Sequence, residues 1–193
     1  MYGYIKIVSI IITLLLVSGC VKIETGGTAE EKKQSSESKA SQIRSEWAFK
    51  LQQASPSEKA QLFIDFFDNV TGIYLKFGND MVAQWKEGEQ GRQQEIPDTE
   101  MRKRIDSWIK TQKPILKAYD DNIEYGFESI KQTGYFGNDI LSLLKNVVDQ
   151  YYDVYTDVFF PQGKVSDYEY KLEDVENKTK LLEGQFKEAI TSN

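Results

Sequence analysis

The spacing of apolar residues is the feature that most constrains how this chain can fold. Between residues 63 and 85 apolar side chains recur every three or four positions, at Phe63, Phe67, Val70, Tyr74, Phe77, Met81 and Trp85. Similar intervals recur in residues 101–130, 140–158 and 168–189. This period gathers the apolar residues on one face of an α-helix, and no segment shows a convincing β-alternation. The sequence therefore predicts an all-α fold, an antiparallel four-helix bundle.

An extra short helix is expected before the bundle, over residues 41–54, because Ile43, Trp47 and Leu51 share one face. Ser55-Pro56 then predicts the start of the first long helix, with serine as the cap and proline in the first turn. Pro114 lies inside the second long helix, where it removes a backbone hydrogen bond, so we expect a kink near residues 112–113.

Two further helix starts are indicated by polar residues. Asn138 or Asp139 is expected to cap the third long helix, after the turn at residues 134–137. Ser166 and Glu169 have the spacing of a capping box, which predicts the start of the last helix.

Composition excludes several classes of site. The chain of 193 residues has no histidine, one cysteine and a formal net charge of -6. The lack of histidine removes Ser-His-Asp and Cys-His catalysis and histidine-ligated zinc, and an acidic chain is a poor nucleic-acid binder. We therefore expect no enzyme activity, no cofactor, no metal centre and no nucleic-acid partner.

The N-terminal segment has the pattern of a signal peptide. An apolar run at residues 7–17 follows the single basic residue Lys6 and ends in Ser18-Gly19-Cys20. The run is about half the roughly 20 residues that a membrane-spanning helix needs. We interpret residues 1–19 as a cleaved signal peptide.

Val17-Ser18-Gly19-Cys20 resembles the lipobox of bacterial lipoproteins. The resemblance implies that the thiol of Cys20 receives a diacylglycerol and that cleavage makes Cys20 the new N-terminus, anchored by acyl chains. It also implies a place in the cell envelope. Because Val21 follows where aspartate would signal inner-membrane retention, the outer membrane is favoured in a Gram-negative cell. The outer face of the cytoplasmic membrane is expected in a Gram-positive one.

An ordinary signal peptide cut before Cys20 is the alternative, and it would leave a free thiol. Residues 20–40 are rich in Gly, Ser, Thr, Glu, Gln and Lys, and we interpret them as the lipidated cysteine and a flexible tether. Residues 41–193 are expected to form the helical domain.

Acidic residues form two groups with helical spacing. Asp149, Asp153 and Asp157 stand four residues apart, which suits either a site for a cation or basic partner or simply a solvated face. A second group consists of Asp120, Asp121, Glu124 and Glu128. It invites comparison with carboxylate-bridged metal bundles, but those use Glu-x-x-His pairs that are absent here.

Tyrosines are the most unusual feature of the helical domain. Six of them are Tyr119, Tyr151, Tyr152, Tyr155, Tyr168 and Tyr170. Positions 151, 155 and 168 fit the core seam, and positions 152 and 170 lie nearer its edge. Tyr135 and Phe136, between glycines, form either an exposed aromatic finger or a cover that closes the end of the bundle.

These features favour an interaction module. We expect a membrane-anchored lipoprotein that binds another envelope protein, with Asp149, Tyr152, Asp153, Asp157, Tyr135 and Phe136 as the candidate surface. The alternative is a binding protein for a small apolar or cationic ligand held between the helices.

Overall fold

The fold is all-α. A computed structural model describes residues 29–86, 95–96 and 99–192, and the signal peptide, Cys20 and the first part of the expected tether lie outside these residues. The described residues form five helices, α2 (Ala29–Gln53), α3 (Pro56–Lys86), α4 (Thr99–Lys131), α5 (Asn138–Phe159) and α6 (Val165–Thr191). The predicted fold class is therefore confirmed.

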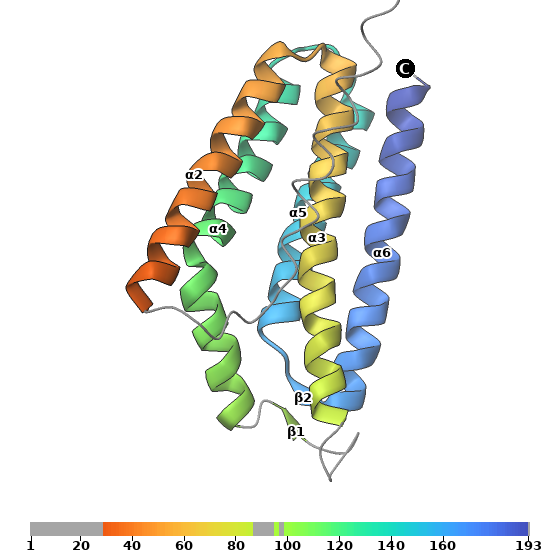
Figure 1. Cartoon of the computed structure of the whole chain (residues 1–193). Coiled ribbons are helices and arrows are strands. Elements are labelled where there is room, and N and C mark those ends of the chain that lie inside the picture. The colour runs from red at the N-terminus through yellow and green to blue at the C-terminus, as the bar shows by residue number, and fades with distance from the viewer. Residues whose placement is uncertain (1–28, 87–94, 97–98, 193) are drawn as a thin grey trace, which may run out of the picture.

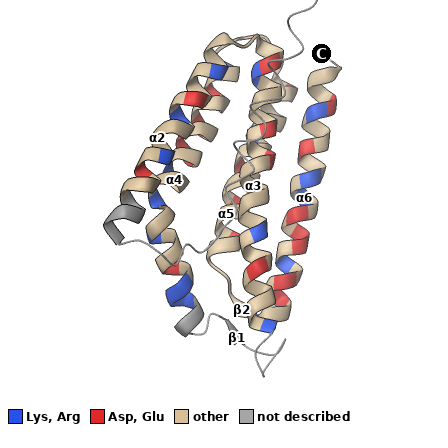
Figure 2. Ribbon diagram, in the orientation of Figure 1, with Lys and Arg blue, Asp and Glu red and all other residues tan. Residues whose placement is uncertain are grey.

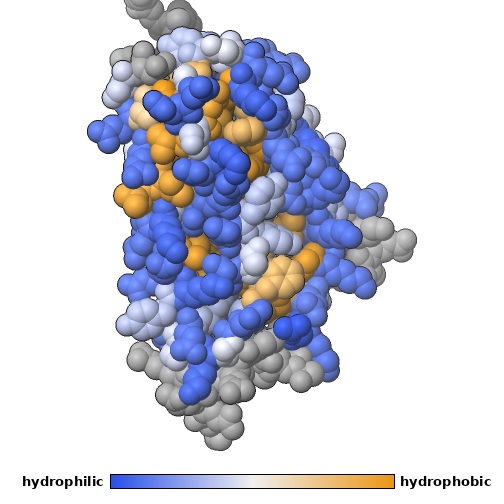
Figure 3. Space-filling model, turned by 180° about the vertical axis from the view of Figure 1, so that it is seen from behind, coloured by the Kyte–Doolittle hydropathy of each residue, from blue (hydrophilic) through white to orange (hydrophobic). Residues whose placement is uncertain are grey.

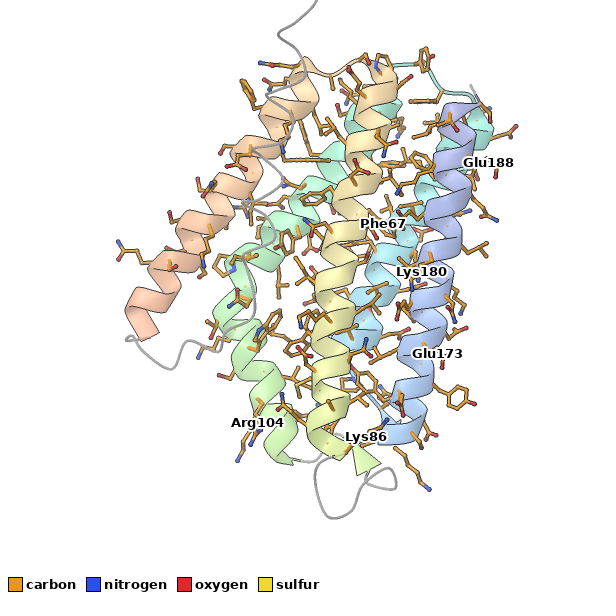
Figure 4. The ribbon with its side chains drawn as sticks, turned by 45° about the vertical axis from the view of Figure 1, so that its right-hand side comes forward. Phe67, Lys86, Arg104, Glu173, Lys180 and Glu188 are labelled. Carbon is orange, nitrogen blue, oxygen red and sulfur yellow. The ribbon has the colours of Figure 1, made fainter. Side chains whose placement is uncertain are left out.

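Helices α3 to α6 form the antiparallel bundle, with successive helices running in opposite directions (Figure 1). Helix α3 packs against α4, α5 and α6, and α5 packs against α6. The core between them is rich in aromatic side chains, because α3 contributes Phe63, Phe67, Tyr74 and Phe77 from one face. Figure 4 shows Phe67 near the middle of α3, whereas Lys86 and Arg104 lie at the lower end of the molecule.

Helix α2 lies outside the bundle along α4, and the two run in the same direction (Figure 1). Trp47 Nε1 donates a buried hydrogen bond of 2.9 Å to the carbonyl oxygen of Asn122, and Arg44 pairs with Asp121 at 2.8 Å. The extra helix was predicted to start at residue 41, which is wrong. It starts at Ala29, because the small side chains of Ser36 and Ala40 are buried and continue the packed face.

The expected flexible tether over residues 20–40 is therefore too long, since residues 29–40 are helical. Their polar composition suggested flexibility, but small residues also suit a close helix contact. Residues 20–28 lie outside the described part of the chain.

The predicted caps are partly confirmed. Ser55 and Glu58 bond reciprocally at the start of α3, through Ser55 N to Glu58 Oε2 at 2.8 Å and Glu58 N to Ser55 Oγ at 3.4 Å. Helix α5 is instead preceded by Gly137, with no side-chain cap, so neither Asn138 nor Asp139 caps it.

Helix α6 also starts earlier than Ser166. Lys164 is its cap, and the carboxylate of Asp167 accepts a hydrogen bond from Lys164 N, so Glu169 plays no part in the capping box. Helix α4 continues through Pro114, and its axis changes direction about midway along its length (Figure 1). A two-residue antiparallel ribbon, β1 (Glu95–Ile96) with β2 (Gly163–Lys164), joins the starts of α4 and α6.

The tyrosines divide between core and edge as predicted. Tyr151 and Tyr168 are fully buried and Tyr155 is partly buried against the core, whereas Tyr152 is 37% and Tyr170 78% exposed. Tyr168 donates to the carbonyl oxygen of Val158 at 2.8 Å. The core is thus built from aromatic rings whose hydroxyls find partners inside it.

Candidate interaction site

The most unusual polar arrangement lies between the second half of α4 and the middle of α5. The hydroxyl of Tyr151 donates to Oδ1 of Asp120 at 2.7 Å, and the hydroxyl oxygens of Tyr74 and Tyr151 lie 3.0 Å apart. Since the single proton of Tyr151 goes to the carboxylate, Tyr74 donates to Tyr151. A chain of hydrogen bonds therefore leads from the core of α3 to the edge of the bundle.

One turn further along α4, a second tyrosine and carboxylate meet at the surface. The hydroxyl of Tyr152 donates to Oε1 of Glu124 at 3.2 Å, and its ring packs edge-on against Tyr151 with centroids 5.1 Å apart. Glu124 itself is exposed. The inner and outer pairs thus form one unit, the tyrosine-carboxylate site, made of Asp120, Glu124, Tyr151 and Tyr152.

Burial sets the electrostatics of this site. It raises the pKa of Asp120, and the nearby charges of Asp121 and Glu124 raise it further, while the hydrogen bond from Tyr151 opposes them. Burial and then Glu124 raise the pKa of Tyr152 to about 12, so this phenol keeps its proton at neutral pH. Asp121 differs, because the ammonium of Lys117 and then Arg44 lower its pKa.

The three aspartates of the acidic row on α5 differ in their exposure and in their partners. Asp149 forms an ion pair with Lys145, and Asp157 is largely buried and paired with Lys171 of α6. Asp153 is exposed and adds to the raised pKa of Lys178, whose main cause is Asp174. Because lysines accompany the row, it forms a mixed-charge surface. The face of the molecule seen in Figure 3 is mostly hydrophilic.

The two aromatic residues at the turn before α5 differ in exposure. Tyr135 is half-exposed, but Phe136 is only 5% exposed and belongs to the core cluster, with its ring edge-on to that of Tyr135. The prediction that Phe136 belongs to the interaction surface is therefore wrong. It closes the end of the bundle, because a phenylalanine has no polar atom to keep in water.

Two features bear on the ligand-binding alternative. Within the described ranges, no group of three or more Cys, Asp or Glu side chains is arranged to hold a metal ion. A shallow hollow lies where α2 ends and α3 begins, lined in part by Phe49, Lys50, Glu58 and Leu62. It lies outside the bundle core, so it offers a ligand only partial cover.

Sequence reasoning missed two members of the site in this role. These are Asp120 and Glu124, which the sequence indicated only as members of an acidic cluster. The four-residue spacing of these two acids predicts only that they share one face of α4. It does not indicate which tyrosine of α5 lies opposite each carboxylate.

Comparisons with known proteins give no match for this chain. No family model matches it, and no curated protein or solved structure matches it. Among the helices of the described part, none is long and apolar enough to cross a membrane.

Proposed function

We propose that this protein is a bacterial lipoprotein, anchored through a lipid on Cys20, whose helical bundle binds another protein of the cell envelope. The lipobox-like sequence at residues 17–20 supports the anchor. Val21 favours the outer membrane in a Gram-negative cell and, in a Gram-positive cell, the anchor would lie on the outer face of the cytoplasmic membrane.

The observation that carries the interaction role is the Tyr152–Glu124 pair at 3.2 Å, set beside the half-buried Asp120. A tyrosine held by a hydrogen bond loses little entropy on binding, and tyrosine is enriched among the residues that dominate interfaces. The surrounding carboxylates favour a partner with lysine or arginine at its surface. The partner's basic side chain would approach Glu124 and stack on the ring of Tyr152.

The anchor is tested by metabolic labelling with a radioactive fatty acid. Wild-type protein should be labelled, and Cys20→Ser should lose the label while still being synthesised. Labelling that survives Cys20→Ser would contradict the lipobox interpretation.

The interaction surface is tested by site-specific photo-crosslinking in intact cells. A photo-reactive residue replaces Asp149, which is exposed one turn before Tyr152 on α5. It should give one discrete crosslinked product, and Glu124→Lys in the same chain should abolish it by reversing the charge. The control position is Tyr170, the most exposed aromatic residue described on a different helix.

Equal crosslinking from positions 149 and 170, or a product from position 149 that Glu124→Lys leaves unchanged, would refute this surface. The small-ligand alternative predicts a thermal shift of the protein with an apolar or cationic compound, lost in Leu62→Glu at the shallow hollow.

A further inference from the structure

The outward face of α4 changes sign halfway along the helix. Lys103, Lys110, Lys113 and Lys117 follow one another at intervals of seven, three and four, so they share a face. The same face continues into Glu124 and Glu128. Residues 102–119 contain six basic residues and one acid, whereas residues 120–128 contain four acids and no base. Figure 2 shows the blue positions on the lower part of α4.

The helix dipole does not explain this order of charges. The N-terminal end of a helix carries a partial positive charge and the C-terminal end a partial negative charge, so cations are favoured near the end and acids near the start. The effect is confined to the first and last turns, and α4 follows the rule at its end, where Lys131 lies in the last turn. Lys110, Lys113 and Lys117 lie in the interior of the helix, beyond the reach of this effect. The dipole therefore gives no reason for the basic half.

The basic half is available for contact. Arg102, Lys103, Lys110 and Lys113 are exposed. None of these four forms an ion pair with a residue that the structure describes, unlike Lys117, which pairs with Asp121 at 2.8 Å. We call Arg102, Lys103, Lys110 and Lys113 the basic stripe. It is a positively charged surface on a protein whose net charge is -6.

The basic stripe lies within reach of the membrane surface that the proposed anchor would occupy. Helices α2 and α4 run side by side in one direction, and Arg44 pairs with Asp121. Ala29, the first residue of α2, and Asp106 each precede that pair by fifteen positions, so the start of α2 lies level with the basic half of α4 along the helix axes. Cys20 precedes Ala29 by nine residues, a reach of at most about 30 Å.

We propose that the basic stripe docks on anionic phospholipid headgroups of the membrane that holds the lipid of Cys20. This inference rests on the proposed function, because the anchor supplies the high effective concentration that makes weak electrostatic contacts sufficient. The same headgroups repel Glu124 and Glu128. Because Glu124 and Glu128 lie on the same face as the lysines, this repulsion favours a tilt of α4 that lifts its acidic end, and with it the tyrosine-carboxylate site, off the lipid surface.

The test uses the full-length lipidated protein in vesicles. Because the lipid occupies the thiol of Cys20, an introduced cysteine is the only free thiol. Ser107→Cys places a fluorophore in the basic half of α4, and Gln132→Cys places it just beyond the other end; both positions are exposed. Vesicles of phosphatidylcholine, with or without roughly a third phosphatidylglycerol, carry a headgroup quencher.

We expect severalfold stronger quenching at position 107 than at position 132 when phosphatidylglycerol is present. The difference should vanish in high salt, because salt screens exposed charges. Lys103→Gln with Lys110→Gln and Lys113→Gln should abolish it too. The matched control, Lys50→Gln with Lys59→Gln and Lys131→Gln, changes the net charge equally at the opposite end and should leave it intact.

Equal quenching at positions 107 and 132, or quenching that ignores phosphatidylglycerol, would overturn the docking. Energy transfer between labelled copies that rises with protein density, without lipid dependence, would instead show that the stripe meets the acidic half of a second copy. Failure to float with phosphatidylcholine vesicles would count against the anchor alone. In that case, flotation with vesicles that contain phosphatidylglycerol would still support docking of the basic stripe. No flotation with those vesicles would refute the docking.

Discussion

Oδ1 of Asp120 on α4 accepts a hydrogen bond of 2.7 Å from the hydroxyl of Tyr151 on α5. This contact joins the outer wall of the bundle to its aromatic core, because Tyr151 is fully buried and is itself bonded to Tyr74. Burial makes the carboxylate costly, as its raised pKa indicates. The pair therefore combines a favourable hydrogen bond with an unfavourable charge.

Asp120→Asn should make the protein more stable at neutral pH. The raised pKa means that, above the ordinary aspartate value of 3.8, folded Asp120 holds a proton that the unfolded chain has lost. The free energy of unfolding therefore falls as the pH rises through this window, up to the folded pKa. Asparagine keeps an oxygen for Tyr151 and carries no charge.

Urea unfolding of wild-type and Asp120→Asn protein between pH 4 and pH 7 measures this effect. The stability difference between the variant and wild type should grow with pH, and it should be smallest near pH 4. A variant that is less stable than wild type at pH 7 would show that the ionised carboxylate is the better partner for Tyr151.

Tyr151→Phe should destabilise the fold more than Tyr74→Phe. Removing the hydroxyl of Tyr151 leaves the buried donor of Tyr74 without a partner and Asp120 without its donor, at a cost of about 1–3 kcal/mol. Tyr74→Phe leaves no buried donor without an acceptor, so it should lower the free energy of unfolding by only about 1 kcal/mol. Equilibrium unfolding of both variants gives the order, and the reverse order would contradict the donor directions assigned here.

The fold was predictable because it depends on periodicity. All seven residues of the predicted row from Phe63 to Trp85 are buried on α3, where other residues such as Ile64 and Val82 widen the buried face. The start of α2 was not predictable from apolar spacing, since its first half packs through Ser36 and Ala40 rather than through large apolar groups. Burial of small residues leaves no periodic apolar signal.

The candidate site was predictable only in part. Tyr152 was recognised as an edge tyrosine, because it lies beside the core seam of α5. Its partner Glu124 belongs to a helix that contacts α5 only through tertiary packing, so no local pattern could pair them. Phe136 was misplaced for a related reason, since a residue between two glycines can fold inward or outward and the rest of the bundle decides which.

Gly126→Ala should destabilise the contact between α2, α3 and α4. A Cβ atom at this position would lie 2.6 Å from Cδ2 of Phe63 and 3.2 Å from Cζ2 of Trp47. Both rings belong to the buried core, so overpacking should cost about 1–3 kcal/mol. Thermal or urea unfolding measures the change.

Gly72→Ala is the matched control within α3. A Cβ atom there meets nothing within 4 Å, and alanine is a better helix former than glycine, so stability should rise by about 0.5–1 kcal/mol. If both alanine variants were stabilised, Gly126 would not be a site of close helix approach.

Ala40→Leu tests whether residues 29–40 pack as helix rather than extend as a tether. Ala40 is 1% exposed, so a leucine side chain would have to push into the packed face of α2 and should cost about 1–3 kcal/mol. Lys39→Leu introduces the same residue at the exposed neighbouring position and should change the free energy of unfolding by less than about 0.5 kcal/mol. Urea unfolding of the two variants gives the comparison. Equal stability of the two variants would mean that this half of α2 does not pack in solution, and the predicted tether over residues 20–40 would then stand.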